Sequence, residues 1–290
     1  MRRTAWLALA WALAIPAGAS PVLLKNYGQE LIDEAVASHP DLLVAMMHVT
    51  PPGEKDNIII ASNIGRFGKK ADEDDMRVVD TGRSNLEVAA GGTRFEVELV
   101  LQDARGRSIG AMGLVFPYQE GVVDRKALEA RAIAIRDHMR RHIAGAGDLV
   151  QPYPREASST TRNHARKLIE QALGAHPALL VLEYVAAPAG GAEGTIVASS
   201  AGRVGAPAGE REGSVLRTGK PALAEAAALE GTEVVLALED ARGARFGALR
   251  AVFAREPGRT AAEAQREAEE IRNAWQKAGV SRESLGALDP

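Results

Sequence analysis

The sequence predicts an α+β protein of two tandem domains, each a five-stranded antiparallel sheet flanked by an N-terminal and a C-terminal helix. Two observations predict this. The first is an internal repeat: His39-Pro40 recurs as His176-Pro177, and the other matched pairs keep the same offset of 137 residues. The second is the order of elements in each repeat, which reads as a helix, two strands, an irregular segment, three strands and a closing helix.

The repeat is long enough for each copy to bury a core of its own, since each unit exceeds a hundred residues. No insertion or deletion shifts the matched positions of the two copies relative to each other. Residues that the copies share therefore point to the fold, and residues that differ point to function. The matched pairs include Ala61-Ser62 with Ala198-Ser199, Gly65-Arg66 with Gly202-Arg203, Thr81-Gly82 with Thr218-Gly219, Asp103-Ala104-Arg105-Gly106 with Asp240-Ala241-Arg242-Gly243, and Gly110-Ala111 with Gly247-Ala248.

The first half of copy 1 opens with a helix over residues 27–38, whose apolar positions recur at helical spacing. His39-Pro40 ends it, because the residue before a proline is pushed out of the helical region. An apolar run over 42–49 predicts a buried strand, and a β-branched run over 58–62 predicts a second one. Residues 63–84 show no clean period and predict a loop with one or two short helical turns.

Three further strands are predicted over residues 86–90, 94–101 and 108–116. Asp103-Ala-Arg-Gly106 joins the last two, with the glycine expected in the left-handed conformation of a tight hairpin. Glycines inside the last strand indicate a close approach of the backbone. A closing helix follows, with an apolar stripe from Leu128 to Ile143.

Copy 2 repeats this order, with principal strands at 179–185, 195–199, 233–238 and 246–253 and a closing helix striped by Ala264, Ala268, Ile271 and Trp275. Glycines and prolines between the copies are typical of a linker. The predicted boundaries are residues 1–19 for a signal peptide, 26–143 for copy 1, 144–160 for the linker, 161–280 for copy 2 and 281–290 for a tail.

The N-terminus has the pattern of a signal peptide. Arg2 and Arg3 form a basic region, residues 6–15 are apolar, and Ala17-Gly18-Ala19 is a small-residue cleavage pattern before Ser20. The apolar stretch is short for a membrane span. We expect a soluble periplasmic or secreted protein without a membrane span after cleavage; the alternative is an uncleaved anchor.

Composition excludes several classes of site. The chain has no cysteine, so it offers no thiolate metal ligand and no cysteine nucleophile. A formal charge of −3 and a pI of about 6.1 give no electrostatic case for nucleic acid. We find no catalytic serine motif and no dinucleotide fingerprint, and therefore expect neither an enzyme nor a cofactor.

The chain resembles the extracytoplasmic PAS-like sensor domains of the Cache or PDC superfamily. The resemblance rests on Ile60-Ala61-Ser62, Gly65-Arg66, Thr81-Gly82, the hairpin at 101–106 and the glycine-containing strand at 109–116, and it recurs in copy 2. It implies tandem PAS-like domains with a small ligand held between the sheet and the loops. The sequence departs from the family in showing no signalling domain, so the expectation is a free-standing module with a separate envelope receptor or transporter as partner.

The segment 62–70 is the predicted ligand site, because two glycines expose backbone amides next to three cations. Copy 2 replaces the two lysines with Ala206-Pro207, which marks them as candidates specific to copy 1. The alternative is a solvated charged loop. The predicted contacts are Arg66, Lys69 and Lys70, with Ser62, Asn63 and His48 as secondary contacts.

Other polar patterns have structural alternatives. Asp72-Glu73-Asp74-Asp75 offers oxygen ligands for Ca²⁺ or Mg²⁺, but acidic residues also favour the first turn of a helix. His138 and His142 have the spacing of a metal pair on a helix, although the glutamate of a zincin is missing. We expect no metal site, and we interpret His39 and His176 as residues that end helices.

These observations predict an exported small-molecule binding module, sensory or solute-binding, for an anionic ligand. Replacing Lys69 and Lys70 by alanine is then expected to weaken ligand binding without lowering the stability of the free protein. The alternative is an envelope protein–protein interaction module with no small ligand, based on the polar loops and the missing output domain.

Overall fold

The computed structural model describes residues 25–187, 194–240 and 242–288. The predicted signal peptide and the end of the predicted tail lie outside these ranges. Within them, no helix is long and apolar enough to cross a membrane.

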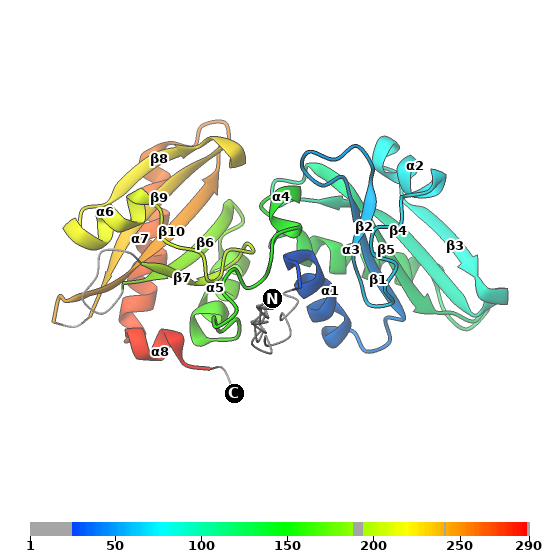
Figure 1. Ribbon diagram of the computed structural model, residues 1–290, viewed down its shortest axis with the longest axis horizontal. Coiled ribbons are helices and arrows are strands. Elements are labelled where there is room, and N and C mark those ends of the chain that lie inside the picture. Colours follow the sequence, from blue (N-terminus) through cyan, green and yellow to red (C-terminus); the bar gives the residue numbers. More distant parts are fainter. Residues whose placement is uncertain (1–24, 188–193, 241, 289–290) are drawn as a thin grey trace, which may run out of the picture.

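Copy 1 forms a five-stranded antiparallel sheet in the order β2-β1-β5-β4-β3 (Figure 1). The predicted first helix and the second strand agree with the structure at both ends, and the irregular segment 63–84 contains one helix, α2. The elements are α1 (Tyr27–Ser38), β1 (Val44–Val49), β2 (Ile58–Ser62), α2 (Glu73–Thr81), β3 (Asn85–Ala89), the 3-10 turn η1 (Ala90–Gly92), β4 (Arg94–Gln102), β5 (Ser108–Pro117) and α3 (Arg125–Arg140).

Copy 2 has the same topology, with the order β7-β6-β10-β9-β8. The predicted fold class, two tandem PAS-like α+β domains, is thereby confirmed. Its elements are α5 (His164–Ala175), β6 (Leu179–Ala186), β7 (Thr195–Ser199), α6 (Glu210–Thr218), β8 (Ala222–Ala226), η2 (Ala227–Leu229), β9 (Gly231–Glu239), β10 (Arg245–Ala254), α7 (Ala261–Lys277) and α8 (Arg282–Gly286).

The same two devices shape both copies. Asn26 caps α1 by accepting a bond from the backbone N–H of Gln29 at 2.7 Å, while its amide donates to the Ile60 carbonyl of β2 at 2.8 Å. Asn163 does both for copy 2. In the predicted hairpin, Asp103 accepts the backbone N–H groups at 105 and 107, and Gly106 is left-handed with a φ of 79°.

Each face of the copy 1 sheet has a different cover. Helices α1 and α3 pack on one face and enclose the main core, which includes Met47, Val97 and Leu99. Residues that alternate with these along β1 and β4, among them His48 and Glu98, face the opposite side, because successive strand residues point to opposite faces. Helix α2 lies on that side through Val78, so a smaller polar and apolar layer sits beneath it.

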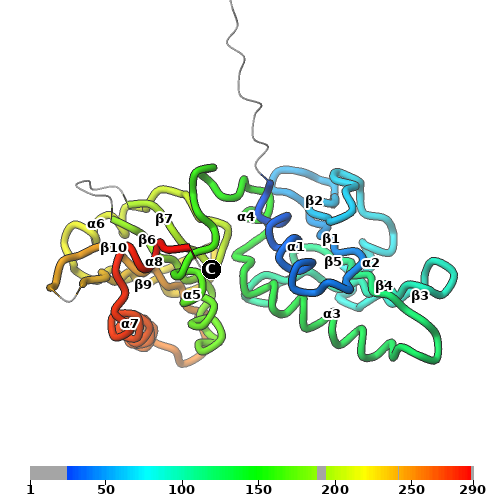
Figure 2. The backbone as a smooth tube through the Cα atoms, turned by 90° about the horizontal axis from the view of Figure 1, so that it is seen from below, coloured from blue at the N-terminus to red at the C-terminus, as the bar shows by residue number. Residues whose placement is uncertain are grey.

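The two copies lie side by side with α1 and α5 between the sheets (Figures 1 and 2). The guanidinium of Arg141 donates to the carbonyl oxygens of Leu173 at 2.7 Å and Pro177 at 2.9 Å, at the end of α5. The segment predicted as the linker contains a short helix, α4 (Ala146–Leu149), and buries Leu149 and Tyr153 against the copy 1 core. This connection is therefore packed rather than a free tether.

Candidate functional site

Two of the predicted contacts hold the loop after β2 in place. The Asn63 side chain accepts the backbone N–H of Ala45 at 2.9 Å and donates to the carbonyl of Leu43 at 3.2 Å. The Ser62 hydroxyl is buried and accepts the N–H of Ile64 at 3.1 Å. Both side chains satisfy backbone groups of the start of β1 and of their own turn.

The three predicted cations are exposed, and the two lysines are paired with carboxylates. Lys69 lies 3.6 Å from a carboxylate oxygen of Asp72, and Lys70 lies 2.7 Å from Asp56, with both lysine side chains more than half exposed. Arg66 is also exposed, with a positive φ of 68°. Exposed pairs of this kind contribute little to stability, so these cations stay available to an incoming group.

His48, by contrast, lies under α2. Its side chain is buried, and its Nδ1 atom lies 3.5 Å from Oδ2 of Asp75. Burial lowers the pKa of His48. Burial and a hydrogen bond with Asp75 raise the pKa of Glu98 to about 9, and burial also raises the pKa of Glu96.

Asp75, Glu96 and Glu98 thus form a group that we call the copy 1 carboxyl cluster. The charge of Lys69 acts on His48 and that of Arg66 acts on Glu96. The structure therefore brings three of the six predicted residues near one cluster, while Ser62, Asn63 and Lys70 serve the loop. The cluster itself was missed in the sequence, although acidic residues inside an apolar strand were visible there.

The acidic run 72–75 caps and begins helix α2, which is the structural alternative to a metal site stated for it above. Asp72 caps the helix by accepting the backbone N–H of Asp75, and the Asp75 carboxylate accepts the backbone N–H of Asp72 at 2.9 Å. His39 and His176 stand at the ends of α1 and α5, as predicted.

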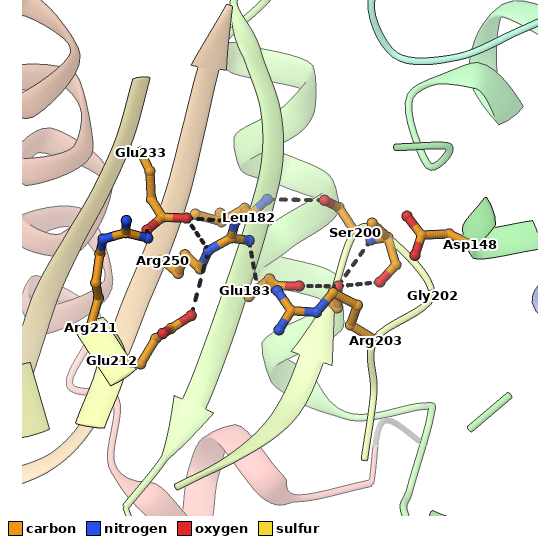
Figure 3. Close-up of polar contacts among 12 residues, drawn as sticks. Asp148, Leu182, Glu183, Ser200, Gly202, Arg203, Arg211, Glu212, Glu233 and Arg250 are labelled. Atoms are coloured by element: carbon orange, nitrogen blue, oxygen red, sulfur yellow. Dashed lines mark hydrogen bonds and ion pairs between the residues drawn. The ribbon is translucent and has the colours of Figure 1, made fainter. Parts of the chain in front are cut away.

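The equivalent position in copy 2 holds a buried ion network centred on Arg250 (Figure 3). The guanidinium of Arg250 donates to Glu233 at 2.7 Å and to Glu183 at 2.9 Å, and its Nε lies 3.5 Å from Glu212. Arg203 adds a second bond to Glu183, at 3.1 Å. Glu183 has no exposed surface, so its charge depends on these arginines and on the Ser199 hydroxyl, which donates to it at 3.0 Å.

A cavity of about 530 Å³ lies between the copies, bordered by α1, α3 and α5. Leu31, Ala35, Ile135 and Met139 supply its apolar wall. The sequence does not predict this cavity, because its wall forms only when α5 of copy 2 docks against copy 1. A volume of this size and a mainly apolar wall are typical of small-molecule sites.

The polar wall of this interdomain cavity combines ions and imidazoles. Arg166 bonds to Glu170 at 2.6 Å and to Glu34 at 3.2 Å. The Nε2 atom of His142 lies 3.3 Å from Glu170, and the ring of His138 lies 5.3 Å from that of His142. Burial lowers the pKa of His142 to about 4, so this imidazole is neutral at pH 7.

The Nδ1 atom of His142 is buried and has no hydrogen-bond partner among the described residues. The two imidazole rings lie edge to face, and Nε2 of His142 points toward the carboxylate of Glu170. The two histidines therefore form a polar part of the cavity wall that is able to hydrogen-bond.

Comparison with known proteins gives no family: no family model matches the chain, and no curated protein matches it. Similar solved structures include PelD from Pseudomonas aeruginosa PAO1, at 16% identity and a TM-score of 0.28 over 94% of this chain and 83% of that one. The inducer-binding domain of PobR from Acinetobacter matches at 10% identity and 0.28 over 39% and 93%. The chromophore-binding domain of a Stigmatella aurantiaca bacteriophytochrome matches at 10% identity and 0.28 over 81% and 93%.

Similarities at such TM-scores carry no conclusion about function. The architecture rests on the two sheets themselves, which share one strand order. The chain is a tandem of two PAS-like α+β domains.

Proposed function

We propose that the protein is an exported module that binds a small molecule in the interdomain cavity. The supporting observation is that cavity of about 530 Å³, which joins an apolar wall to a few convergent polar groups. Export is supported by the signal-peptide pattern of residues 1–19.

The ligand we propose is a carboxylate with an apolar body. Arg162 and Arg166 both line the cavity, and the imidazole of His138 provides a further N–H donor. Burial raises the pKa of Glu34, which eases protonation of this carboxyl when an anion approaches. An apolar body would cover the side formed by the aliphatic residues.

A thermal-shift screen of the purified protein tests this proposal. The library holds carboxylates, amino acids, phosphates, haem and divalent metals, and a ligand specific for the folded state raises the melting temperature by mass action. We expect a saturable shift with a carboxylate. A flat screen on a cooperatively melting protein would instead favour the interaction module.

Two variants then locate the site. Ala35→Phe fills the cavity from α1 and is expected to abolish the shift, whereas Lys69→Ala with Lys70→Ala removes the exposed cations and is expected to keep it. The opposite result would assign the ligand to the loop at 62–70 that the sequence predicts. Loss in neither variant would reject both sites.

Export has its own test. Expression of the full chain in a Gram-negative host, followed by N-terminal sequencing of the periplasmic fraction, is expected to give a chain that starts at Ser20. An unprocessed chain in the membrane fraction would indicate an anchor, and one in the cytosol would overturn the proposal.

One observation favours a protein-interaction role as the second candidate. In the predicted loop, the side chains of Ile64 and Phe67 are exposed by 43% and 60%. Exposed apolar residues that lie together are a feature of interaction surfaces. Under this alternative, Phe67→Ser abolishes capture of an envelope partner and leaves the thermal-shift profile unchanged.

A further inference from the structure

The duplication allows one cluster to be compared with its own counterpart. In copy 2, the side chain of Arg250 rises from β10 into a frame of carboxylates, Glu183, Glu212 and Glu233 (Figure 3). Only 12% of the Arg250 side chain is exposed. This frame therefore binds a guanidinium that the chain itself supplies.

Copy 1 keeps part of the frame and lacks the cation. At the repeat offset of 137 residues, Glu96 corresponds to Glu233 and Asp75 to Glu212, but the position of Arg250 is Gly113. A Cβ atom added at Gly113 would lie 3.2 Å from Cγ of Met46, the residue that stands where copy 2 has Glu183, and 3.9 Å from Oε1 of Glu96. The backbone position from which the arginine of copy 2 reaches its carboxylates thus faces a carboxylate in copy 1 as well.

Among the described residues, no lysine or arginine forms an ion pair with the other carboxyl groups of the copy 1 cluster either. Glu98 is 5% exposed and shares a hydrogen bond with Asp75. His48 is 2% exposed, and its Nδ1 faces Asp75 without a hydrogen-bond partner among the described residues. Buried carboxyl groups that lie close together repel each other when they are ionised, and a bound cation relieves this repulsion.

The cations near the cluster are exposed, and Lys69 pairs with a residue outside the cluster. Lys69 is exposed and pairs with Asp72, and Arg66 is exposed on the loop after β2. From β3, Asn85 hydrogen-bonds Glu98, and Glu87 adds negative charge near Glu96. The net character of the cluster is therefore acidic, with Glu96 partly exposed as the side open to solvent.

We propose that the copy 1 carboxyl cluster binds a small organic cation of the guanidinium or primary ammonium type, which takes the role that the Arg250 guanidinium has in copy 2. The site lies under α2, on the sheet face opposite to α1 and α3. It is thus separate from the interdomain cavity and takes a ligand of opposite charge. Carboxylates recognise guanidinium by bidentate, charge-assisted bonds and ammonium as a point charge.

Titration calorimetry of the purified protein with methylguanidinium and with ethylammonium tests the site, with acetate as the anionic probe and sodium chloride to match ionic strength. We expect saturable binding of at least one cation and none of acetate. Glu96→Gln should weaken the binding by about tenfold or more, which corresponds to about 1.4 kcal/mol. The matched control Glu225→Gln removes the same charge from an exposed strand of copy 2 and should leave binding unchanged.

Two reciprocal variants complete the test. Gly113→Arg supplies the missing guanidinium from within and is expected to abolish cation binding. Arg250→Gly empties the frame of copy 2, and added methylguanidinium is expected to restore part of the lost melting temperature. If Gly113→Arg fails to fold, Glu96→Gln keeps the test of the copy 1 site decisive.

Three results would overturn the proposal: no saturable cation binding by the wild-type protein, equal binding of acetate, or unchanged affinity in Glu96→Gln. The Ala35→Phe variant separates this site from the interdomain cavity. Cation binding should survive that substitution, so failure of the cavity proposal would leave the present one standing.

Discussion

Arg250 is the residue whose loss is expected to cost the most at a single position. Glu183 is fully buried and bonded by Arg250 at 2.9 Å, so Arg250→Met leaves a buried charge with Arg203 as its remaining ionic partner. Breaking a buried pair in this way costs about 3–5 kcal/mol. Urea unfolding should show this loss, whereas Arg211→Met, at an exposed arginine of the same network, should cost about 1 kcal/mol or less.

His142 is expected to make the free energy of unfolding depend on pH. Its pKa is about 4 in the folded protein and 6.5 ordinarily, because burial disfavours the charged imidazole. Between these values the unfolded chain binds the proton more tightly, so stability is lost as the pH falls from 6.5 to 4, by up to about 3 kcal/mol.

Urea unfolding at several pH values between 4 and 7 measures this dependence. His142→Gln should remove much of the slope, while His138→Gln, at an exposed residue one turn away, should retain it. Equal slopes in the wild-type protein and in His142→Gln would contradict the assignment.

The sequence contained the signal for the Arg250 network, but a single copy does not reveal it. An arginine stands in the apolar run 246–253, and acids stand in the apolar runs 179–185 and 233–238. Periodicity places them on strands, and only the pairing of β10 with β6 and β9 brings the charges together. Comparing the copies position by position, with Gly113 opposite Arg250, would have found the contrast.

Strand β5 runs so close to its neighbour β1 at Gly110 that no side chain fits there. A Cβ atom there would collide with the carbonyl oxygen of His48, the residue before Val49, which is the register partner of Gly110. Gly110→Ala must therefore push β5 away from β1, and overpacking of this kind costs about 3 kcal/mol. Chemical denaturation should show the loss.

Gly174→Ala is the matched control for Gly110→Ala. Gly174 lies in the last turn of α5 with no atom within 4 Å of an added Cβ. Alanine there should be neutral or stabilise by about 0.5–1 kcal/mol, because glycine is the poorer helix former. Similar losses in both variants would mean that the Gly110 effect is not steric.

At the scale of elements, the regular segments were predictable and the irregular ones were not. The stripes Leu128 to Met139 and Ala264 to Trp275 are buried as their helical period predicts. Helix α2 was predicted only as one or two short helical turns, because its apolar side consists of little beyond Val78. The linker was read from its glycines and prolines, which say nothing about the burial of Leu149 and Tyr153.

The whole molecule depends on contacts that no local pattern encodes. The interdomain cavity belongs to α1, α3 and α5 together, so its existence follows from how the copies dock. Tyr27 shows the point: its hydroxyl lies 3.1 Å from the carbonyl oxygen of His142 and 3.3 Å from that of Ser200, in the other copy. In the sequence it is only the first residue of a helix.

These contacts predict that the two copies unfold together. Arg141 donates to carbonyls at the end of α5, which have no partner inside the helix, and Arg105 donates to the carbonyls of Leu229 and Glu230 at 3.1 and 2.8 Å. Charge-assisted bonds of this kind are stronger than neutral ones. We expect one calorimetric transition for the wild-type protein, with equal calorimetric and van't Hoff enthalpies.

Removing both arginines should uncouple the copies. In Arg105→Ala with Arg141→Ala, the docked surfaces lose the bonds of both arginines and keep that of Arg166 to Glu34, while each sheet keeps its own core, so the transition should split or the calorimetric enthalpy should exceed the van't Hoff value. Arg83→Ala with Arg217→Ala removes the same charge from exposed positions and should leave a single transition. Two transitions in the wild-type protein would show that the docking is too weak to couple the copies, and a cavity formed by that docking would then close only when a ligand binds in it.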